Sequence, residues 1–168
     1  MHIKNIAGGS YLHIGIVTSI TARLTQFAKD FHSETVKLQI NTGGVPLFRS
    51  SNVALWPILG KIKEIANCVP FVIGLFSGKT KLGSVNEFLT DFVDEMSKVE
   101  VDGIIFNSKH YPVSLDSVIC DAPSRAFVKC IKGHTGYSVC ERCTQNGVYR
   151  QNQISFPECE AGKRRDDR

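Results

Sequence analysis

Long hydrophobic runs are what this sequence lacks most clearly. No stretch of its 168 residues reaches the roughly 18 uninterrupted apolar residues that a membrane-spanning helix needs. The N-terminal segment MHIKNIAGGSYLHIG contains no long apolar stretch before its glycines, so it is not a signal peptide. We therefore expect a nuclear or cytoplasmic protein that is not secreted and has no membrane partner.

A strong excess of charge of either sign is also missing. The net charge is +4, and charged residues make up 21% of the chain, as in an ordinary soluble domain. Half of this excess lies in the last six residues, where four basic side chains stand beside two acidic ones. The body of the chain is only slightly basic, so charge alone gives little support for nucleic-acid binding.

A nucleotide-binding loop is excluded by spacing. Residues 74–80 read GLFSGKT and follow a predicted strand, but the phosphate-binding motif needs four residues between its first glycine and the Gly-Lys pair. Here only three residues separate them, so this loop could not wrap a phosphate in the usual way. Internal repeats and low-complexity tracts are absent as well.

Cysteines are present, and four of the six lie between positions 120 and 143. Without a secretory signal, we interpret them as reduced thiols and metal ligands. Cys140-x-x-Cys143 has the spacing of a structural Zn²⁺ site, which His134 and Cys130 would complete. Cys159 is an alternative fourth ligand, because Cys130 lies on a predicted helix and could belong to the core. The alternative to a zinc site is a set of free thiols beside a surface histidine.

The spacing of apolar residues predicts an α/β fold. Helical spacing marks residues 18–31, with Thr18 or Ser19 as N-cap, a short helix over 56–66, and the best helix from Ser84, where Ser84 and Glu87 form a capping box. A last short helix covers residues 124–129. Strands are expected at 36–41, 45–48, 69–75, 103–111 and 115–120.

Asp121 closes the last of these strands. The predicted order of three strands, a helix, a strand and a helix is that of the ribonuclease-H-like fold, in which carboxylates on the first and fourth strands share divalent ions. Phosphoryl transfer on DNA uses two Mg²⁺ or Mn²⁺ ions roughly 3.5–4 Å apart, held by about three acidic side chains. The alternative is that Asp121 only caps the helix beginning near Ala122-Pro123.

An ordered series of motifs runs through the chain. It comprises Tyr11-x-His13-x-Gly15, GVPLFRSS at 44–51, WPIL at 56–59, PFVIGL at 70–75, residues 85–95, CDAP at 120–123, and Gly133-His134 followed by Cys140-x-x-Cys143. Over roughly residues 8 to 157, this series resembles the catalytic core of CACTA-type (En/Spm-like) transposases. The resemblance implies a ribonuclease-H-like domain with an acidic triad that cuts DNA at element ends and joins it to a target. It also favours a catalytic origin for Asp121 and zinc binding by His134, Cys140 and Cys143.

Two departures from the family pattern weaken the expectation of activity. The first acidic position is occupied by Gly43, which has no ligand atom, and the third acidic residue would lie beyond the end of this chain. Acidic residues of the polar tail are poor substitutes; they are Glu158, Glu160, Asp166 and Asp167. Divalent Mg²⁺ or Mn²⁺ is expected only where a catalytic site is complete.

The organisation we expect is a C-terminally truncated, partial ribonuclease-H-like core over residues 1–157. It has a mixed sheet with flanking helices, a zinc knuckle at 130–143, and a disordered polar tail at 158–168. The favoured function is a DDE-type DNA transposase fragment that is catalytically incomplete, with the Asp121 and Gly43 positions side by side at neighbouring strand ends. DNA is the ancestral partner, and the sequence leaves open whether the chain forms a homo-oligomer. The alternatives are a domesticated, zinc-stabilised DNA-binding or protein-interaction module, or a soluble α/β domain in which the cysteines and Asp121 are incidental.

Overall fold

The computed structural model describes residues 2–6, 8–47, 53–79, 82–131, 137, 143–157 and 162–163. The chain divides into two units, Met1–Cys120 and Asp121–Arg168, which are described separately below. None of the helices in these described stretches is long and apolar enough to span a membrane.

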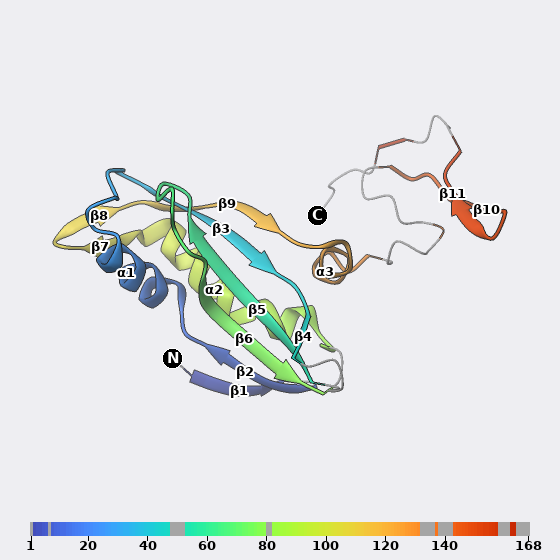
Figure 1. The fold of residues 1–168 in the computed structure, drawn as a ribbon, viewed down its shortest axis with the longest axis horizontal. Coiled ribbons are helices and arrows are strands. Elements are labelled where there is room, and N and C mark those ends of the chain that lie inside the picture. Colours follow the sequence, from blue (N-terminus) through green and yellow to red (C-terminus); the bar gives the residue numbers. More distant parts are fainter. Residues whose placement is uncertain are drawn as a thin grey trace. The chain divides into compact units, whose positions relative to one another are not determined.

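The first unit is a mixed α/β structure, as the sequence predicted. Its strands are β1 (His2–Ile6), β2 (Gly9–His13), β3 (Val36–Thr42), β4 (Val45–Pro46), β5 (Ala54–Ile62), β6 (Phe71–Gly78), β7 (Ile104–Phe106), β8 (Lys109–Tyr111) and β9 (Val113–Ile119). Its helices are α1 (Ile16–Gln26) and α2 (Val85–Asp102). The main sheet has the order β1-β2-β6-β5-β3-β9, with β4 paired to β5 (Figure 1). Adjacent strands are antiparallel except β3 and β9, which are parallel.

Both helices pack on the same side of this sheet. Helix α2 contacts β2, β6 and β9, while α1 contacts β6 and α2, and Figure 1 shows α2 running behind β5 and β6. The strands bury alternate residues: in β3, Val36, Leu38 and Ile40 are buried and the residues between them are not. The Phe88 ring of α2 meets Tyr11 and Trp56 edge-on, with centroid distances of 5.7 and 6.4 Å. Burial of each such side chain contributes about 1.5–3 kcal/mol, so this layer holds the unit together.

The helix expected at residues 56–66 is wrong, because this segment forms strand β5 and the turn after it. Ile58, Gly60 and Ile62 are buried in alternation, which is the period of a strand. Pro57 lies between the part of β5 that pairs with β4 and the part that pairs with β3. On the side of β5 that faces β3 and β4, no described strand residue is paired with Pro57. The N–H that proline lacks is therefore not needed there, and a proline is tolerated inside the strand.

Two further boundaries differ from the expectation. Residues 103–111 form not one strand but the hairpin β7–β8, whose turn residues Asn107 and Ser108 have φ of 49° and 63°. Two consecutive left-handed residues are typical of a tight hairpin turn. Helix α1 begins at Ile16 with Gly15 as N-cap, rather than at Thr18 or Ser19. The cap of α2 is confirmed, since Ser84 Oγ accepts the Glu87 N–H at 3.3 Å.

The second unit contains α3 (Ala122–Val128) and the hairpin of β10 (Val148–Arg150) and β11 (Gln153–Ser155). Helix α3 confirms the short helix expected after Asp121, whereas the sequence did not predict the hairpin. Of the expected tail, the structure describes only Gly162 and Lys163. The backbone of Lys163 forms an isolated antiparallel β-bridge with that of Cys143, and the Thr144 N–H donates to the Gly162 carbonyl at 3.0 Å.

Candidate functional site

The carboxyl ends of β3 and β9 lie at one edge of the main sheet, which we call the strand-end edge. In this parallel pair, Asn41 is opposite Ile119, and the Asn41 side chain donates to the Ile119 carbonyl at 3.2 Å. Parallel neighbours bring their carboxyl ends to the same edge, where α/β proteins commonly place functional groups. Along the chain, β3 is followed by Gly43, and β9 is followed by Cys120 and Asp121.

The β3 side of the strand-end edge has no acidic side chain. Gly43 is half-buried and supplies no ligand atom. The preceding Thr42 is 3% exposed, and its hydroxyl has no hydrogen-bond partner among the described residues. The described glycines with positive φ are Gly8, Gly15 and Gly103, so the backbone at Gly43 does not require glycine. A side chain with a carboxylate could therefore occupy this position without backbone strain.

Asp121 acts as the N-cap of α3. Its Oδ1 accepts the Ser124 N–H at 2.8 Å, and a proline follows in the first turn. Hydrogen bonds from the side chain and backbone of Ser124 hold the Asp121 pKa below its ordinary value, because they favour the ionised form. The capping alternative thus describes the contacts of Asp121. A carboxylate that stays ionised also remains suitable as a ligand for a hard cation.

The expected zinc ligands are only partly within the described residues. His134, Cys140 and the alternative Cys159 lie outside them. Cys130 follows α3, has φ of 52° and is exposed, so it does not belong to a core. Cys143 is half-buried. Within the described part of the chain, no three His, Cys, Asp or Glu side chains are arranged to hold a metal. Zinc binding by Cys130, His134, Cys140 and Cys143 therefore stays a prediction.

A polar cluster that the sequence did not predict joins β2, α1 and α2 in the first unit. We call Tyr11, His13 and Glu95 the helix-capping cluster. His13 Nδ1 lies 3.1 Å from the Tyr11 hydroxyl, and His13 Nε2 lies 2.8 Å from Glu95 Oε2. The two oxygens of Glu95 also accept the backbone N–H groups of Ile16 and Val17, at 2.7 and 3.1 Å.

The cluster supplies a cap that α1 lacks in its own sequence. The N-cap position is Gly15, which has no side chain to accept the first N–H groups of the helix. The Glu95 carboxylate fills this role from α2, where its charge also favours the helix N-terminus. Gly15 has φ of 106°, and a Cβ there would lie 3.3 Å from Glu95 Oε1, so both backbone and space favour glycine. The series Tyr11-x-His13-x-Gly15 thus has a structural function.

The same cluster is poorly suited to bind a metal or to act as a base. Burial raises the pKa of Tyr11, so its hydroxyl keeps its proton and can donate to His13 Nδ1. His13 Nε2–H then donates to Glu95, so both ring nitrogens are engaged. The nearby Asp91 pairs with Lys4 at 2.8 Å and His2 at 3.3 Å. Burial would raise the Asp91 pKa, but the hydrogen bond and charge of Lys4, aided by His2 and His13, hold it below its ordinary value.

One signal in the sequence could have revealed this cluster. Phe88, Phe92 and Val99 define the buried stripe of α2, and Glu95 falls on the same stripe at helical spacing. A carboxylate on a buried helix face needs a partner. Local spacing does not show which residues provide that partner, because His13 is 82 residues away in the sequence.

Comparisons with known proteins identify no relatives: no family model, curated protein or solved structure matches this chain. Any function of this chain therefore has to follow from its own residues and their geometry.

Proposed function

We propose that the chain is a DDE-type DNA transposase core of the ribonuclease-H-like class that has lost catalytic competence. The observation that supports this most directly is the parallel pairing of β3 with β9, in which Asn41 is opposite Ile119. In the expected ribonuclease-H-like order, these correspond to the first and fourth strands. Along this chain they are separated by β4, β5, β6, α2, β7 and β8, and β1, β2 and α1 precede β3. The adjacency of β3 and β9 is what the class requires if carboxylates after the two strands are to share metal ions.

Loss of competence follows from position 43. A two-metal mechanism needs one ion to activate the attacking oxygen and another to stabilise the leaving oxygen, and both ions need carboxylate ligands. Asp121 provides a carboxylate after β9, but Gly43 provides none after β3. A complete site of this class holds Mg²⁺ or Mn²⁺ with carboxylates after both strands, and this chain has one only after β9.

A nicking assay tests this proposal. Supercoiled plasmid is incubated with the purified full chain and Mn²⁺, and nicked circles are measured over time. We expect the wild type and Asp121→Ala to be indistinguishable from the protein-free control. Robust nicking by the wild type that is abolished by Asp121→Ala would refute the loss of activity.

A second candidate function is a zinc-stabilised binding module without chemistry. It is favoured by the contacts of Asp121, which serves as a helix cap, and by the exposure of Cys130, which precedes Cys140-x-x-Cys143 by ten residues in the sequence. Both features work without a catalytic metal. Metal analysis of the purified protein should give one zinc per chain, lost on combining Cys140→Ser with Cys143→Ser.

Cys68→Ser is the matched control for the thiol substitutions, because Cys68 is buried and lies in the first unit. It should leave the zinc content unchanged. Retention on DNA at moderate salt that disappears with the zinc would identify the module as DNA-binding. A metal-free wild-type protein would exclude this candidate.

A further inference from the structure

One face of the main sheet is not covered by any described element of the first unit. Helices α1 and α2 contact each other and the opposite face, so we call the uncovered side the open face (Figure 1). Strand alternation places on it the residues between the buried ones. Six of these are aliphatic, all half-buried, and form what we call the apolar patch: Leu12, Leu55, Pro57, Leu59, Val72 and Leu75.

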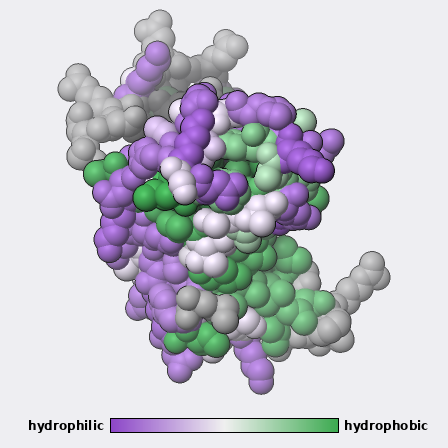
Figure 2. All heavy atoms as spheres, turned by 90° about the vertical axis from the view of Figure 1, so that its left-hand side faces the viewer, coloured by the Kyte–Doolittle hydropathy of each residue, from purple (hydrophilic) through white to green (hydrophobic). Residues whose placement is uncertain are grey.

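The apolar patch is continuous across three strands. Leu12 is opposite Leu75 in the β2–β6 pair, and Leu75 is opposite Pro57 in the β6–β5 pair. On β1, Ile3 is opposite Leu12 and is 72% exposed. Figure 2 shows hydrophobic surface on its lower right, the side that faces the reader in Figure 1. A contiguous apolar surface of this kind marks a site of association.

The chemistry of the patch favours a protein as partner. Nucleic acids offer phosphates and flat bases, and proteins bind single strands through aromatic side chains on which bases stack. The six residues of the apolar patch include no aromatic side chain, and the rings of Tyr11, Trp56 and Phe76 lie on the helix side. Six neighbouring aliphatic side chains are best covered by the aliphatic side chains of another protein surface.

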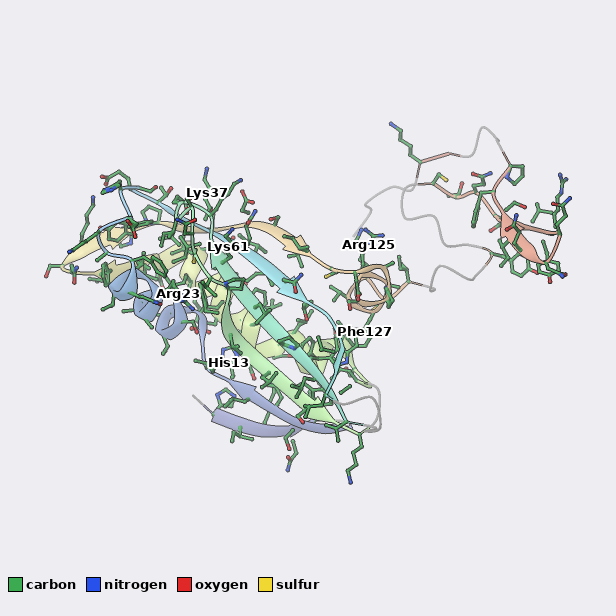
Figure 3. The ribbon with its side chains drawn as sticks, viewed as in Figure 1. His13, Arg23, Lys37, Lys61, Arg125 and Phe127 are labelled. Atoms are coloured by element: carbon green, nitrogen blue, oxygen red, sulfur yellow. The ribbon has the colours of Figure 1, made fainter. Side chains whose placement is uncertain are left out.

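Two lysines border the apolar patch. Lys61 follows Leu59 on the open face of β5, and its partner on β3 is Gln39. Lys37 lies two residues from Gln39 on the same face, so the two lysines are diagonal neighbours (Figure 3). Neither has an ion-pair partner among the described residues, whereas the nearby Lys63 pairs with Asp116 at 2.7 Å.

The outer surface of α2 has the opposite charge. Helix α2 contains six acidic residues and one lysine, of which Glu95 belongs to the helix-capping cluster and Asp91 pairs with Lys4. Among the acidic side chains, Asp94 and Asp102 have no ion pair within the described residues. They lie beside Val93 and Val101, which are 50% and 84% exposed. Eight residues of helix separate the two members of each pair by about 12 Å, so charge and apolar surface repeat together along the helix.

We propose that copies of this chain associate head to tail. The outer surface of α2 in one copy covers the apolar patch of the next, with Asp94 and Asp102 facing Lys61 and Lys37. A helix laid on a sheet face is the ordinary way in which such a face is covered. Because the two surfaces differ, the contact is heterologous and can repeat along a ring or a chain of copies.

Sedimentation velocity of the full chain over a range of concentrations tests the proposal. We expect the wild type to form species at multiples of 18.6 kDa that grow with concentration and dissociate at high salt. Lys37→Glu with Lys61→Glu makes both surfaces acidic, and Asp94→Lys with Asp102→Lys makes both basic. Each double variant alone should remain at the monomer mass. An equimolar mixture of the two should associate again, because opposite charges then meet at every contact.

Three outcomes would overturn the proposal. They are a wild type that stays monomeric at every concentration, double variants that associate as well as the wild type, and a mixture that fails to associate although each variant has a wild-type far-ultraviolet circular dichroism spectrum. A monomeric wild type whose retention on DNA is lost in the Lys37→Glu, Lys61→Glu variant would assign the open face to nucleic acid instead.

Discussion

The helix-capping cluster and the strand-end edge use polar side chains in opposite ways. In the cluster, Glu95 and His13 each make hydrogen bonds with every polar atom of their head groups, and Gly15 leaves room for them. At the edge, Gly43 contributes no side chain, and the Thr42 hydroxyl is buried without a partner among the described residues. The first arrangement stabilises the fold. The second has no acidic side chain after β3 and leaves a buried hydroxyl without a partner among the described residues.

The largest effect is expected from removing the shared carboxylate of the cluster. Glu95→Ala leaves two N–H groups of α1 and one nitrogen of His13 without their acceptor, which should lower the free energy of unfolding by about 2–3 kcal/mol. Chemical denaturation measures this. Asp94→Ala is the matched control on the preceding residue of α2, and it should change stability by less than about 0.5 kcal/mol. Equal losses in the two variants would contradict the capping function of Glu95.

A pair of glycine substitutions compares the two regions directly. Gly15→Ala places a Cβ at φ of 106° and 3.3 Å from Glu95, so it should cost about 1–2 kcal/mol. Gly43→Ala introduces no residue at positive φ and should change stability by less than about 0.5 kcal/mol. Thermal unfolding of both variants measures the difference. A reversed order would mean that Gly43, and not Gly15, is required by the backbone.

The pH dependence of the ion pair beside the cluster has a definite sign. The folded-state pKa of Asp91 lies below its ordinary value of 3.8, so its stabilising contribution is present above that value and is lost as pH falls through the folded pKa. Asp91→Asn should therefore cost about 1 kcal/mol at pH 7 and nothing once the pH lies well below the folded-state pKa. Denaturation of wild type and variant across this range measures the gap. A gap that widens on acidification would contradict the pairing with Lys4.

The smallest effect is expected at the strand-end edge. Thr42→Val replaces a buried hydroxyl that has no partner with a methyl group of similar size. Because no hydrogen bond is lost, stability should stay the same or rise by up to about 1 kcal/mol. Thermal unfolding measures whether the variant is more or less stable than the wild type. A destabilised variant would show that the hydroxyl has a partner in solution, and the contrast with the helix-capping cluster would weaken.

Local sequence signals predicted the elements whose periodicity is unambiguous. Strand β3 alternates strictly, and α2 combines an apolar stripe with a capping box at Ser84, so both were found with nearly correct bounds. Strand β5 was misassigned because Trp56, Leu59 and Ile62 also fit a helical spacing, and only pairing with β3 and β6 decides between the two. Strands β1 and β2 lack a pattern because Gly9 and Ser10 interrupt it.

The residues of the candidate site also differ in whether the sequence alone could locate them. Position 43 and Asp121 could be located from the sequence, since Asp121 directly follows the predicted strand 115–120 and position 43 comes two residues after the predicted strand 36–41. The helix-capping cluster could be located only in part: Glu95 falls on the apolar stripe of α2, but His13 is 82 residues away and meets it only when α2 packs on β2. Contacts at long range depend on packing, which no local pattern of apolar residues records.

The absence of a metal-binding carboxylate at position 43 is tested most directly by isothermal titration calorimetry of Mn²⁺ binding to wild type, Gly43→Asp and Gly43→Asn. We predict that the wild type binds Mn²⁺ weakly, that Gly43→Asp increases the affinity by about tenfold or more, as expected of an added carboxylate ligand, and that the uncharged, equally large Asn variant does not. Tight Mn²⁺ binding by the wild type that is abolished by Asp121→Ala and unaffected by Gly43→Asp would contradict the loss of a metal site through Gly43.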